Sequence, residues 1–317
     1  MKKMIALLMS LLTLGLCGCG SNTAVTPATT EATQPTIDPN APLCDGRNLK
    51  MLVVTSSFGL NTTQFIWDIA KAEGAENVVV GRLYYSGCSL KMHAEYAKTN
   101  AAVYDYTKNT SGEWVKQPNT TLEYGLKDED WDIIYLQQGA ASSPIASTYE
   151  GYLDEVLEYL QANKTNPNAR FIWNMTWAYQ GDSTQNVFIN TFNGDQMAMY
   201  DSILNAVKTH IVPRPVFAAI IPTGTAIQNA RSSYFGDKLT KDTYHLNNLG
   251  RAIAGYTVWS TLTGKPLTAV NLGPISSYDL PDTLELTETD RQVIIECVNN
   301  AIANPWEVTS SAYTTAP

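Results

Sequence analysis

Short apolar runs that alternate with amphipathic segments constrain this chain more than any other feature. Residues 49–55 form an apolar run typical of a buried strand, and apolar residues then recur at helical spacing. Strands are predicted at 49–55, 77–84, 132–136, 170–175 and 215–221, and helices at 62–73, 90–102, 149–162, 196–210, 249–262 and 287–303. Strands separated by helices pair in parallel and are covered on both faces. The sequence therefore predicts an α/β/α sandwich with a parallel sheet of about five strands.

Charge and motifs exclude several classes of partner. The net charge of -9 would repel a phosphate backbone, so we expect no nucleic acid partner. The sequence has no Walker A motif, no Gly-x-Gly-x-x-Gly and no zinc-type spacing, so no cofactor or metal is expected. Cys44, Cys88 and Cys297 allow one disulfide at most, and the sequence does not identify the pair.

The N-terminus has the pattern of an export signal. Lys2 and Lys3 precede an apolar run at 5–16 that is short for a membrane span. The following Leu-Cys-Gly-Cys resembles the bacterial lipobox, so we expect a signal peptide at 1–19 with lipidation of Cys19. The alternative is a plain secretory signal, and both predict export. The lipobox favours a cell-surface protein held to the membrane only by this anchor.

Composition divides the rest of the chain. Residues 20–45 are rich in Thr, Pro and Ala and are predicted to form a flexible tether, because such a stretch buries no core. The folded domain is expected at 46–305. The last segment, 306–317, has a similar composition and is predicted to be a disordered tail.

Polar residues follow the predicted strands. Ligands bind at the carboxyl ends of the strands in such sheets, so these residues are the candidates for a site. They are Ser56 and Ser57 after the first strand, 86–89 after the second, 137–139 after the third, 176–179 after the fourth, and 242–245 before the penultimate helix. Each has a simpler explanation alone: Ser57 as a turn or cap residue, and His245 as a loop histidine.

The combination predicts nucleophilic catalysis. A serine hydroxyl needs a base within hydrogen-bond reach, and a carboxylate must orient that base. Asp242 lies three residues before His245, so one segment supplies both groups for Ser57. The backbone N–H groups of Ser57 and Gly87, with the amide of Gln138, are expected to form an oxyanion hole.

This order of Ser, Gly, amide and Asp-x-x-His resembles the SGNH (GDSL-type) hydrolase superfamily. Within it, the chain is similar to a bacterial branch without an assigned function. The resemblance covers about 48–262 and is carried by TSSFG, SGCSLK, LQQGA, MTWAYQ, GTAIQNAR and DTYHLNNLGR. It implies a flavodoxin-like fold, an acyl-serine intermediate on Ser57, His245 as base, Asp242 as its partner and Gly87 as an oxyanion donor.

Two positions depart from the superfamily pattern. Ser56 stands where Asp or Asn usually precedes the nucleophile. The usual oxyanion asparagine is replaced by a glutamine, with Gln137 and Gln138 as candidates. Gln138 is favoured because the following glycine resembles the Gln-Gly-Glu block of sialate O-acetylesterase relatives.

The predicted reaction is hydrolysis of a carboxylic ester, with an acetyl or other short acyl group on an extracellular carbohydrate or another small ester as substrate. Aromatic residues near the site are candidates for stacking on a sugar. The expected substrate contacts are Gln137, Trp177, Tyr179, Tyr244, His93 and Arg231. Trp177 is equally well explained as core, and His93 and Arg231 as loop braces. The rival functions are an acyltransferase with the same site and a non-catalytic glycan-binding lipoprotein, which the Ser56 departure favours.

Overall fold

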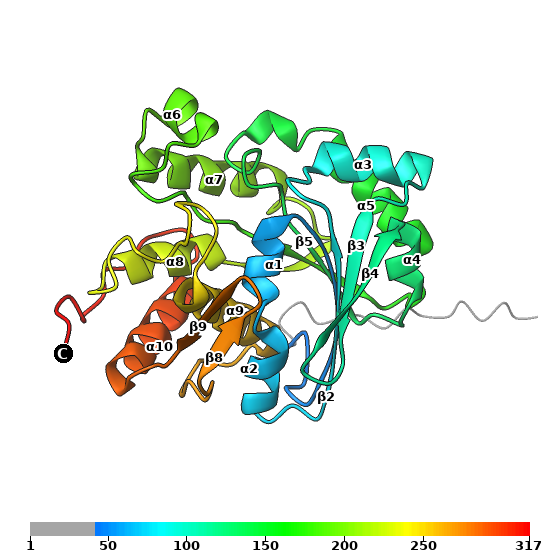
Figure 1. Cartoon of the computed structure of the whole chain (residues 1–317). Helices are drawn as coiled ribbons and strands as arrows, with labels where there is room; N and C mark the ends of the chain where they lie inside the picture. Colours follow the sequence, from blue (N-terminus) through cyan, green and yellow to red (C-terminus); the bar gives the residue numbers. More distant parts are fainter. Residues whose placement is uncertain (1–41) are drawn as a thin grey trace, which may run out of the picture. The chain divides into compact units, whose positions relative to one another are not determined.

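The computed structural model describes residues 42–317 (Figure 1). The predicted signal peptide, its Cys19 and the tether up to residue 41 lie outside the described residues. Within 42–317, none of the helices combines the length and apolar character that a membrane crossing requires. The three cysteines of this range, Cys44, Cys88 and Cys297, are free thiols.

A seven-stranded sheet forms the centre of the domain, in the order β4-β3-β2-β1-β5-β6-β7. Its strands are β1 (Asn48–Thr55), β2 (Asn77–Tyr84), β3 (Tyr104–Asn109), β4 (Trp114–Thr120), β5 (Ile133–Leu136), β6 (Arg170–Asn174) and β7 (Phe217–Ile221). The pairs β2/β1, β1/β5, β5/β6 and β6/β7 are parallel. Renumbered among themselves, these five strands have the order 2-1-3-4-5 of flavodoxin-like sheets. The predicted parallel sheet is therefore confirmed.

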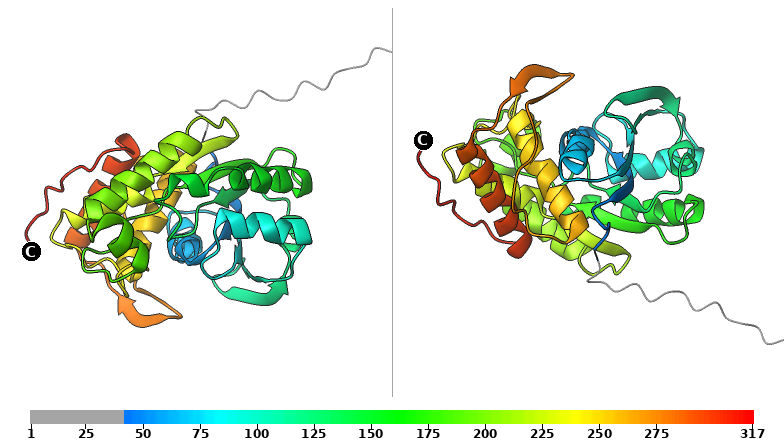
Figure 2. Two further views of the ribbon diagram at one scale, coloured as in Figure 1. Left: turned by 90° about the horizontal axis from the view of Figure 1, so that it is seen from above. Right: turned by 90° about the horizontal axis from the view of Figure 1, so that it is seen from below.

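Helices cover both faces of the sheet. They are α1 (Ser57–Thr63), α2 (Ile66–Ala72), α3 (Leu90–Thr99), α4 (Leu122–Lys127), α5 (Tyr152–Asn163), α6 (Asn186–Phe192), α7 (Gln196–His210), α8 (Thr223–Arg231), α9 (Asn248–Thr263) and α10 (Glu288–Ala303). Helix α9 packs against α1, α2, α8 and α10, while α3, α4 and α5 pack together. Figure 2 shows α1 nearly end-on between these two groups. The core lies between the layers, where Val54, Ile134 and Ile172 are fully buried.

Two regions differ from the predicted elements. An antiparallel hairpin, β3–β4, extends the sheet beyond β2. The single helix predicted at 62–73 is divided into α1 and α2, and α1 begins earlier, at Ser57. A second hairpin, β8 (Ile275–Ser277) with β9 (Leu280–Leu284), precedes α10.

The predicted domain boundaries were wrong at both ends. The N–H groups of Leu43 and Cys44 both donate to the carbonyl of Leu262, so the last residues of the predicted tether belong to the domain. The tail at 306–317 is ordered along α8: Thr309 N–H donates to Asn229 at 2.7 Å, and Tyr234 N–H donates to Tyr313 at 2.8 Å. Composition misled the prediction because these residues satisfy their backbone groups on the surface of α8 and α10 rather than in a core.

Candidate active site

The carboxyl end of β1 holds a chain of three hydrogen-bonding side chains. β1 ends at Thr55, and Ser57 is the first residue of α1. Its Oγ lies 2.8 Å from Nε2 of His245. The other ring nitrogen of His245, Nδ1, lies 2.7 Å from Oδ2 of Asp242. The structure thus brings together the three residues that the sequence singled out, although Ser57 and His245 are 188 positions apart.

Helix capping does not account for the two serines. Ser56 occupies the N-cap position, but its side chain makes no capping hydrogen bond. The Ser57 hydroxyl is directed to His245 instead, and this side chain is only half-buried. A half-buried serine hydroxyl beside an imidazole has the access and the partner that a nucleophile requires.

The loop that carries His245 is held by Asp242. Its Oδ1 accepts a hydrogen bond from the backbone N–H of His245 at 2.8 Å, while Oδ2 faces the ring. Between them, Thr243 has a φ of 74°, in the left-handed region. Partial burial raises the pKa of Asp242, but the hydrogen bonds from His245 outweigh it and leave this pKa below the usual value. An ionised carboxylate at Nδ1 keeps the proton there and leaves Nε2 free to accept from Ser57.

Residues of α1 and the loop after β6 support the same arrangement. Asn61, one turn after Ser57, accepts the N–H of Leu246 through Oδ1 at 2.8 Å. Trp177 donates from Nε1 to the carbonyl of Tyr244 at 2.8 Å and stacks on Phe58, with the ring centroids 4.0 Å apart. The sequence analysis missed Asn61, and its spacing of four residues from Ser57 was the available signal.

Two backbone N–H groups at this edge are available for an oxyanion. Thr55 pairs with Tyr84 in the register of β1 and β2, so Ser57 and Gly87 both follow neighbouring strand ends. Within residues 42–317, neither the Ser57 nor the Gly87 N–H has a backbone acceptor. Gly87 has a φ of 63°, and an added Cβ would meet nothing within 4 Å. Glycine is therefore required here by backbone conformation rather than by packing.

The prediction that Gln138 supplies an oxyanion donor is wrong. This side chain is fully buried, and its Nε2 donates to both the carbonyl and the hydroxyl of Thr148 at 3.1 Å. Its Oε1 accepts the N–H of Leu90, the first residue of α3, at 2.8 Å. Gln138 therefore fixes the loop that carries Gly87 instead of contacting substrate.

Gln137 is also buried, so the prediction that it contacts substrate is wrong. Its Nε2 donates to the Ser56 hydroxyl at 3.4 Å, and its Oε1 accepts from Tyr135 at 3.1 Å and from Asn174 at 3.4 Å. These contacts form a polar network beneath Ser57. They also give Ser56 a structural partner in the position where relatives have Asp or Asn.

Most of the other predicted substrate contacts lie in the core. His93 is 0% exposed and hydrogen bonds Tyr104 through Nδ1 at 2.8 Å. Burial lowers the pKa of His93 to about 3, so it stays neutral. Arg231 is buried, pairs with Asp237 at 2.7 Å and donates to the carbonyl of Ala178. Trp177 and Tyr179 are buried too. Only Tyr244 is half-buried, and its ring centroid lies 4.0 Å from that of His245.

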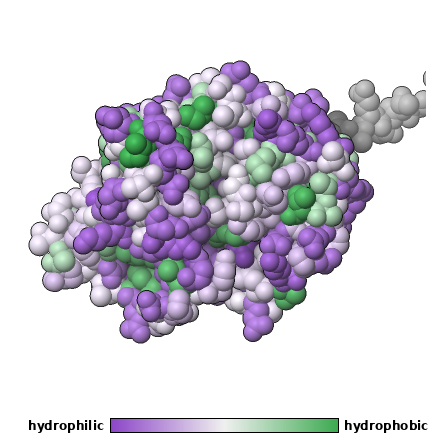
Figure 3. Space-filling model, turned by 45° about the horizontal axis from the view of Figure 1, so that its top comes forward, coloured by the Kyte–Doolittle hydropathy of each residue, from purple (hydrophilic) through white to green (hydrophobic). Residues whose placement is uncertain are grey.

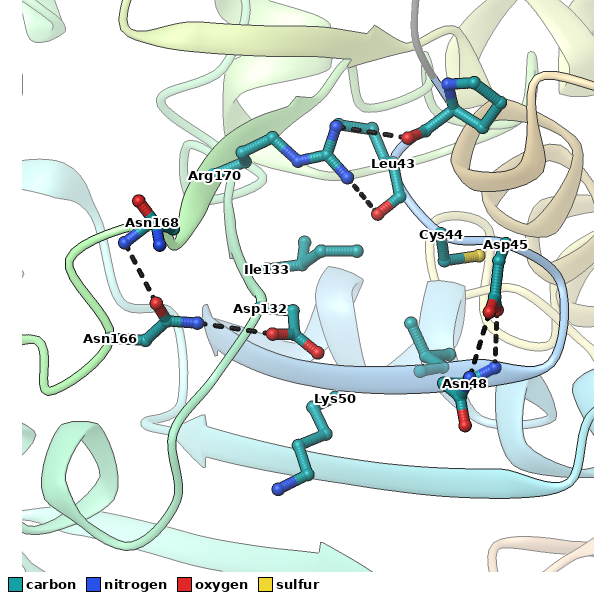
Figure 4. A pocket seen from close by; sticks show the side chains of 12 residues that line it. Leu43, Cys44, Asp45, Asn48, Lys50, Asp132, Ile133, Asn166, Asn168 and Arg170 are labelled. Carbon is teal, nitrogen blue, oxygen red and sulfur yellow. Dashed lines mark hydrogen bonds between the residues drawn. The ribbon is translucent and has the colours of Figure 1, made fainter. Parts of the chain in front are cut away.

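A cavity of about 500 Å³ lies at the opposite end of the sheet, against the amino ends of β1 and β6 (Figure 4). Its polar groups bind one another: Arg170 donates to the carbonyls of Pro42 and Leu43, and Asn166 donates to Asp132. No nucleophile and base face each other among the residues that line it. The catalytic chemistry is therefore assigned to the carboxyl end of β1.

Substituting Gly87 tests the proposed oxyanion loop. Gly87→Ala should lower kcat/KM by roughly 10²-fold, because a shift of about 1 Å in a reacting group is enough for such a loss. Gly151→Ala is the matched control: Gly151 has a φ of 72° and equally open surroundings, but it precedes α5. Both variants should lose about 1 kcal/mol of stability from left-handed strain. Equal kinetics in the two variants would remove Gly87 from the site.

A flavodoxin-like sheet with a serine, histidine and aspartate joined at its carboxyl edge defines an α/β protein of hydrolase-like architecture. The family described as "Domain of unknown function (DUF4886)" matches residues 50–277, and the chain belongs to this family. It is similar to the crystal structure of a DUF4886 family protein from Bacteroides uniformis ATCC 8492, with 32% identity and a TM-score of 0.74. That similarity covers 83% of this chain and 98% of the other.

Two more distant structures share parts of the fold. A putative SGNH hydrolase from Slackia heliotrinireducens is 15% identical, with a TM-score of 0.44, over 68% of this chain and all of that one. A carbohydrate esterase family 3 structure from Talaromyces cellulolyticus is 13% identical, with a TM-score of 0.37, over 69% of this chain and 97% of that one. Neither similarity bears on function. No curated protein matches the sequence.

Proposed function

We propose that this protein is a serine-dependent carboxylic ester hydrolase. The observation that carries the proposal is the continuous relay from Ser57 Oγ to His245 at 2.8 Å and from His245 to Asp242 at 2.7 Å. Such distances are those at which a base removes the hydroxyl proton and a carboxylate stabilises the resulting imidazolium.

The reaction follows from the positions of these groups. His245 Nε2 takes the proton of Ser57 as Oγ bonds to the ester carbonyl carbon. The carbonyl oxygen becomes an oxyanion, which the N–H groups of Ser57 and Gly87 stabilise. The C–O bond to the alcohol then breaks, and His245 returns its proton to that oxygen. Water, deprotonated by His245, attacks the acyl-serine and releases the acid and free Ser57.

A short acyl ester of a carbohydrate is the proposed substrate class. Hydrophilic and intermediate residues predominate on the face turned forward in Figure 3, and hydrophobic residues lie in small separate groups. This surface suits a polar substrate better than a lipid. Tyr244 supplies a half-buried aromatic ring beside His245, and such a ring packs against the apolar face of a sugar. We also propose that the protein is exported and anchored through Cys19.

Two measurements on the full mature chain test the proposed activity. We expect hydrolysis of p-nitrophenyl acetate and covalent labelling by a fluorophosphonate, with peptide mass spectrometry placing the label on Ser57. A label on another serine, or hydrolysis without any label, would contradict the acyl-serine mechanism on this residue.

A further inference from the structure

A cleft of about 620 Å³ lies along α1, between the β3–β4 hairpin and the β8–β9 hairpin. Charged and aromatic side chains line it beside α1. They are Asp68, Arg82, Tyr84, Asp105, Trp114 and Tyr278. None of these residues takes part in the relay of Ser57, His245 and Asp242, so the cleft is unexplained by the reaction alone.

Arg82 is a buried cation without a counter-ion among the described residues. It is 3% exposed, and its guanidinium lies over the Trp114 ring, 3.2 Å from the centroid. Nε donates to Thr107 at 3.1 Å, but the buried Nη1 has no hydrogen-bond partner within residues 42–317. Asp105, in the same cleft, pairs with Lys116 at 2.7 Å instead. Burial lowers the pKa of Arg82 to about 9.

A buried and unpaired guanidinium costs free energy unless an anion completes it. The fork of N–H groups matches a planar carboxylate with two parallel hydrogen bonds. Stacking on Trp114 also fixes the plane of the fork in advance. Arg82 is therefore prepared for a ligand carboxylate that enters the cleft.

The other walls suit a sugar ring. Tyr278 is 83% exposed in the turn between β8 and β9, and Tyr84 is half-buried at the end of β2. Tyrosine rings in such positions pack against the apolar face of a sugar and donate through their hydroxyls. Asp68 lies on α2 without an ion-pair partner among the described residues, and burial raises its pKa to about 6. Its carboxyl group can accept a sugar hydroxyl.

The cleft is continuous with the proposed nucleophile along one helix face. Leu60 and Gln64 line it and follow Ser57 by three and seven residues. That spacing places the three residues on the same face of a helix. At 1.5 Å per residue, the cleft extends from about 5 Å to about 10 Å beyond Ser57.

We propose that this cleft is a subsite for an acidic sugar of the uronic-acid type, whose carboxylate Arg82 binds. The proposal rests on the proposed esterase function, because the acidic sugar then neighbours the acylated unit presented to Ser57. It narrows the substrate class from acylated carbohydrates to acylated acidic glycans.

Calorimetric titration of the full mature Ser57→Ala chain tests the subsite without turnover. The probes are an oligogalacturonate and a neutral galactose oligomer of the same length. We expect the acidic oligomer to bind about 10-fold tighter or more. Adding Arg82→Met should abolish this preference, whereas adding Arg47→Met should keep it, because Arg47 is exposed and pairs with Glu76. Equal binding of the two oligomers to Ser57→Ala would overturn the proposal.

Further arms separate the alternatives. A thermal melt verifies that the Arg82→Met chain is folded. If it is not, Arg82→Lys should fold and lose most of the preference, because lysine keeps the charge but not the two-toothed fork. Tighter binding of a sulfated galactose oligomer than of the oligogalacturonate would overturn the carboxylate assignment. Arg82-dependent binding in a protein without esterase activity would refute the proposed catalysis alone, and esterase activity without acidic preference would refute the subsite alone.

Discussion

Ser57→Ala is expected to lower ester hydrolysis by roughly 10⁴-fold or more while leaving the melting temperature nearly unchanged. Without the hydroxyl, no acyl-enzyme forms. Loss of a capping serine would instead cost about 1 kcal/mol and leave activity largely intact. The hydrogen bond of Ser57 to His245, together with the absence of a capping bond from Ser56, favours the first outcome. Rates with p-nitrophenyl acetate and a thermal melt separate the two.

Ser56→Ala is the internal control for this substitution. Its hydroxyl is buried and accepts only a long hydrogen bond, 3.4 Å, from Gln137. We therefore expect a loss of activity much smaller than that of Ser57→Ala. A Ser57→Ala variant that keeps its activity, or a Ser56→Ala variant that loses as much, would reassign the nucleophile.

His245→Ala should match Ser57→Ala, and the double variant should be little worse than either single one. The reason is that the two groups act as a unit, so their effects do not add. Asp242→Ala should retain more activity, because the carboxylate orients and stabilises the imidazole rather than reacting.

The parallel part of the sheet was predictable because buried strands are short, apolar and bounded by helical periodicity. Ile133–Leu136 is buried at every position, and the sequence showed it as an apolar run. The β3–β4 hairpin was missed because β4 is an exposed edge strand with one buried residue, so its side chains carry little apolar signal. Helix α1 was shortened in the prediction because its start is polar.

Within the candidate site, the local motif was predictable and the distant support was not. Asp242 and His245 lie three residues apart, so one loop orients both. A polar residue after a strand, however, has the same sequence signature whether it is exposed or buried. Gln138 is satisfied by Leu90 and Thr148, and only the packing of α3 against β5 reveals that. Arg82 within an otherwise buried strand was a signal that the sequence analysis left unused.

Removing Asp279, in the turn between β8 and β9, is expected to cause a large loss of stability for a single loop substitution. Arg251 is 2% exposed and donates from Nη1 and Nη2 to the two oxygens of Asp279, each at 2.7 Å. Asp279→Ala leaves this buried charge without its counter-ion. Breaking a buried pair from one side costs about 3 kcal/mol or more. The midpoint of urea unfolding measures the loss.

The matched control is Glu76→Ala, which breaks the exposed pair with Arg47 and should cost about 1 kcal/mol or less. The pH dependence provides a second check. Hydrogen bonds from Arg251 hold the pKa of Asp279 well below its usual range, against an opposing effect of partial burial. A carboxyl group whose folded pKa is lowered stabilises the protein above its unfolded pKa, and this contribution is lost as the pH falls through the folded pKa. The stability difference between wild type and Asp279→Ala should therefore stay constant from about pH 7 to 5 and narrow below about pH 4. A difference that grew on acidification would contradict an ionised Asp279 as the partner of Arg251.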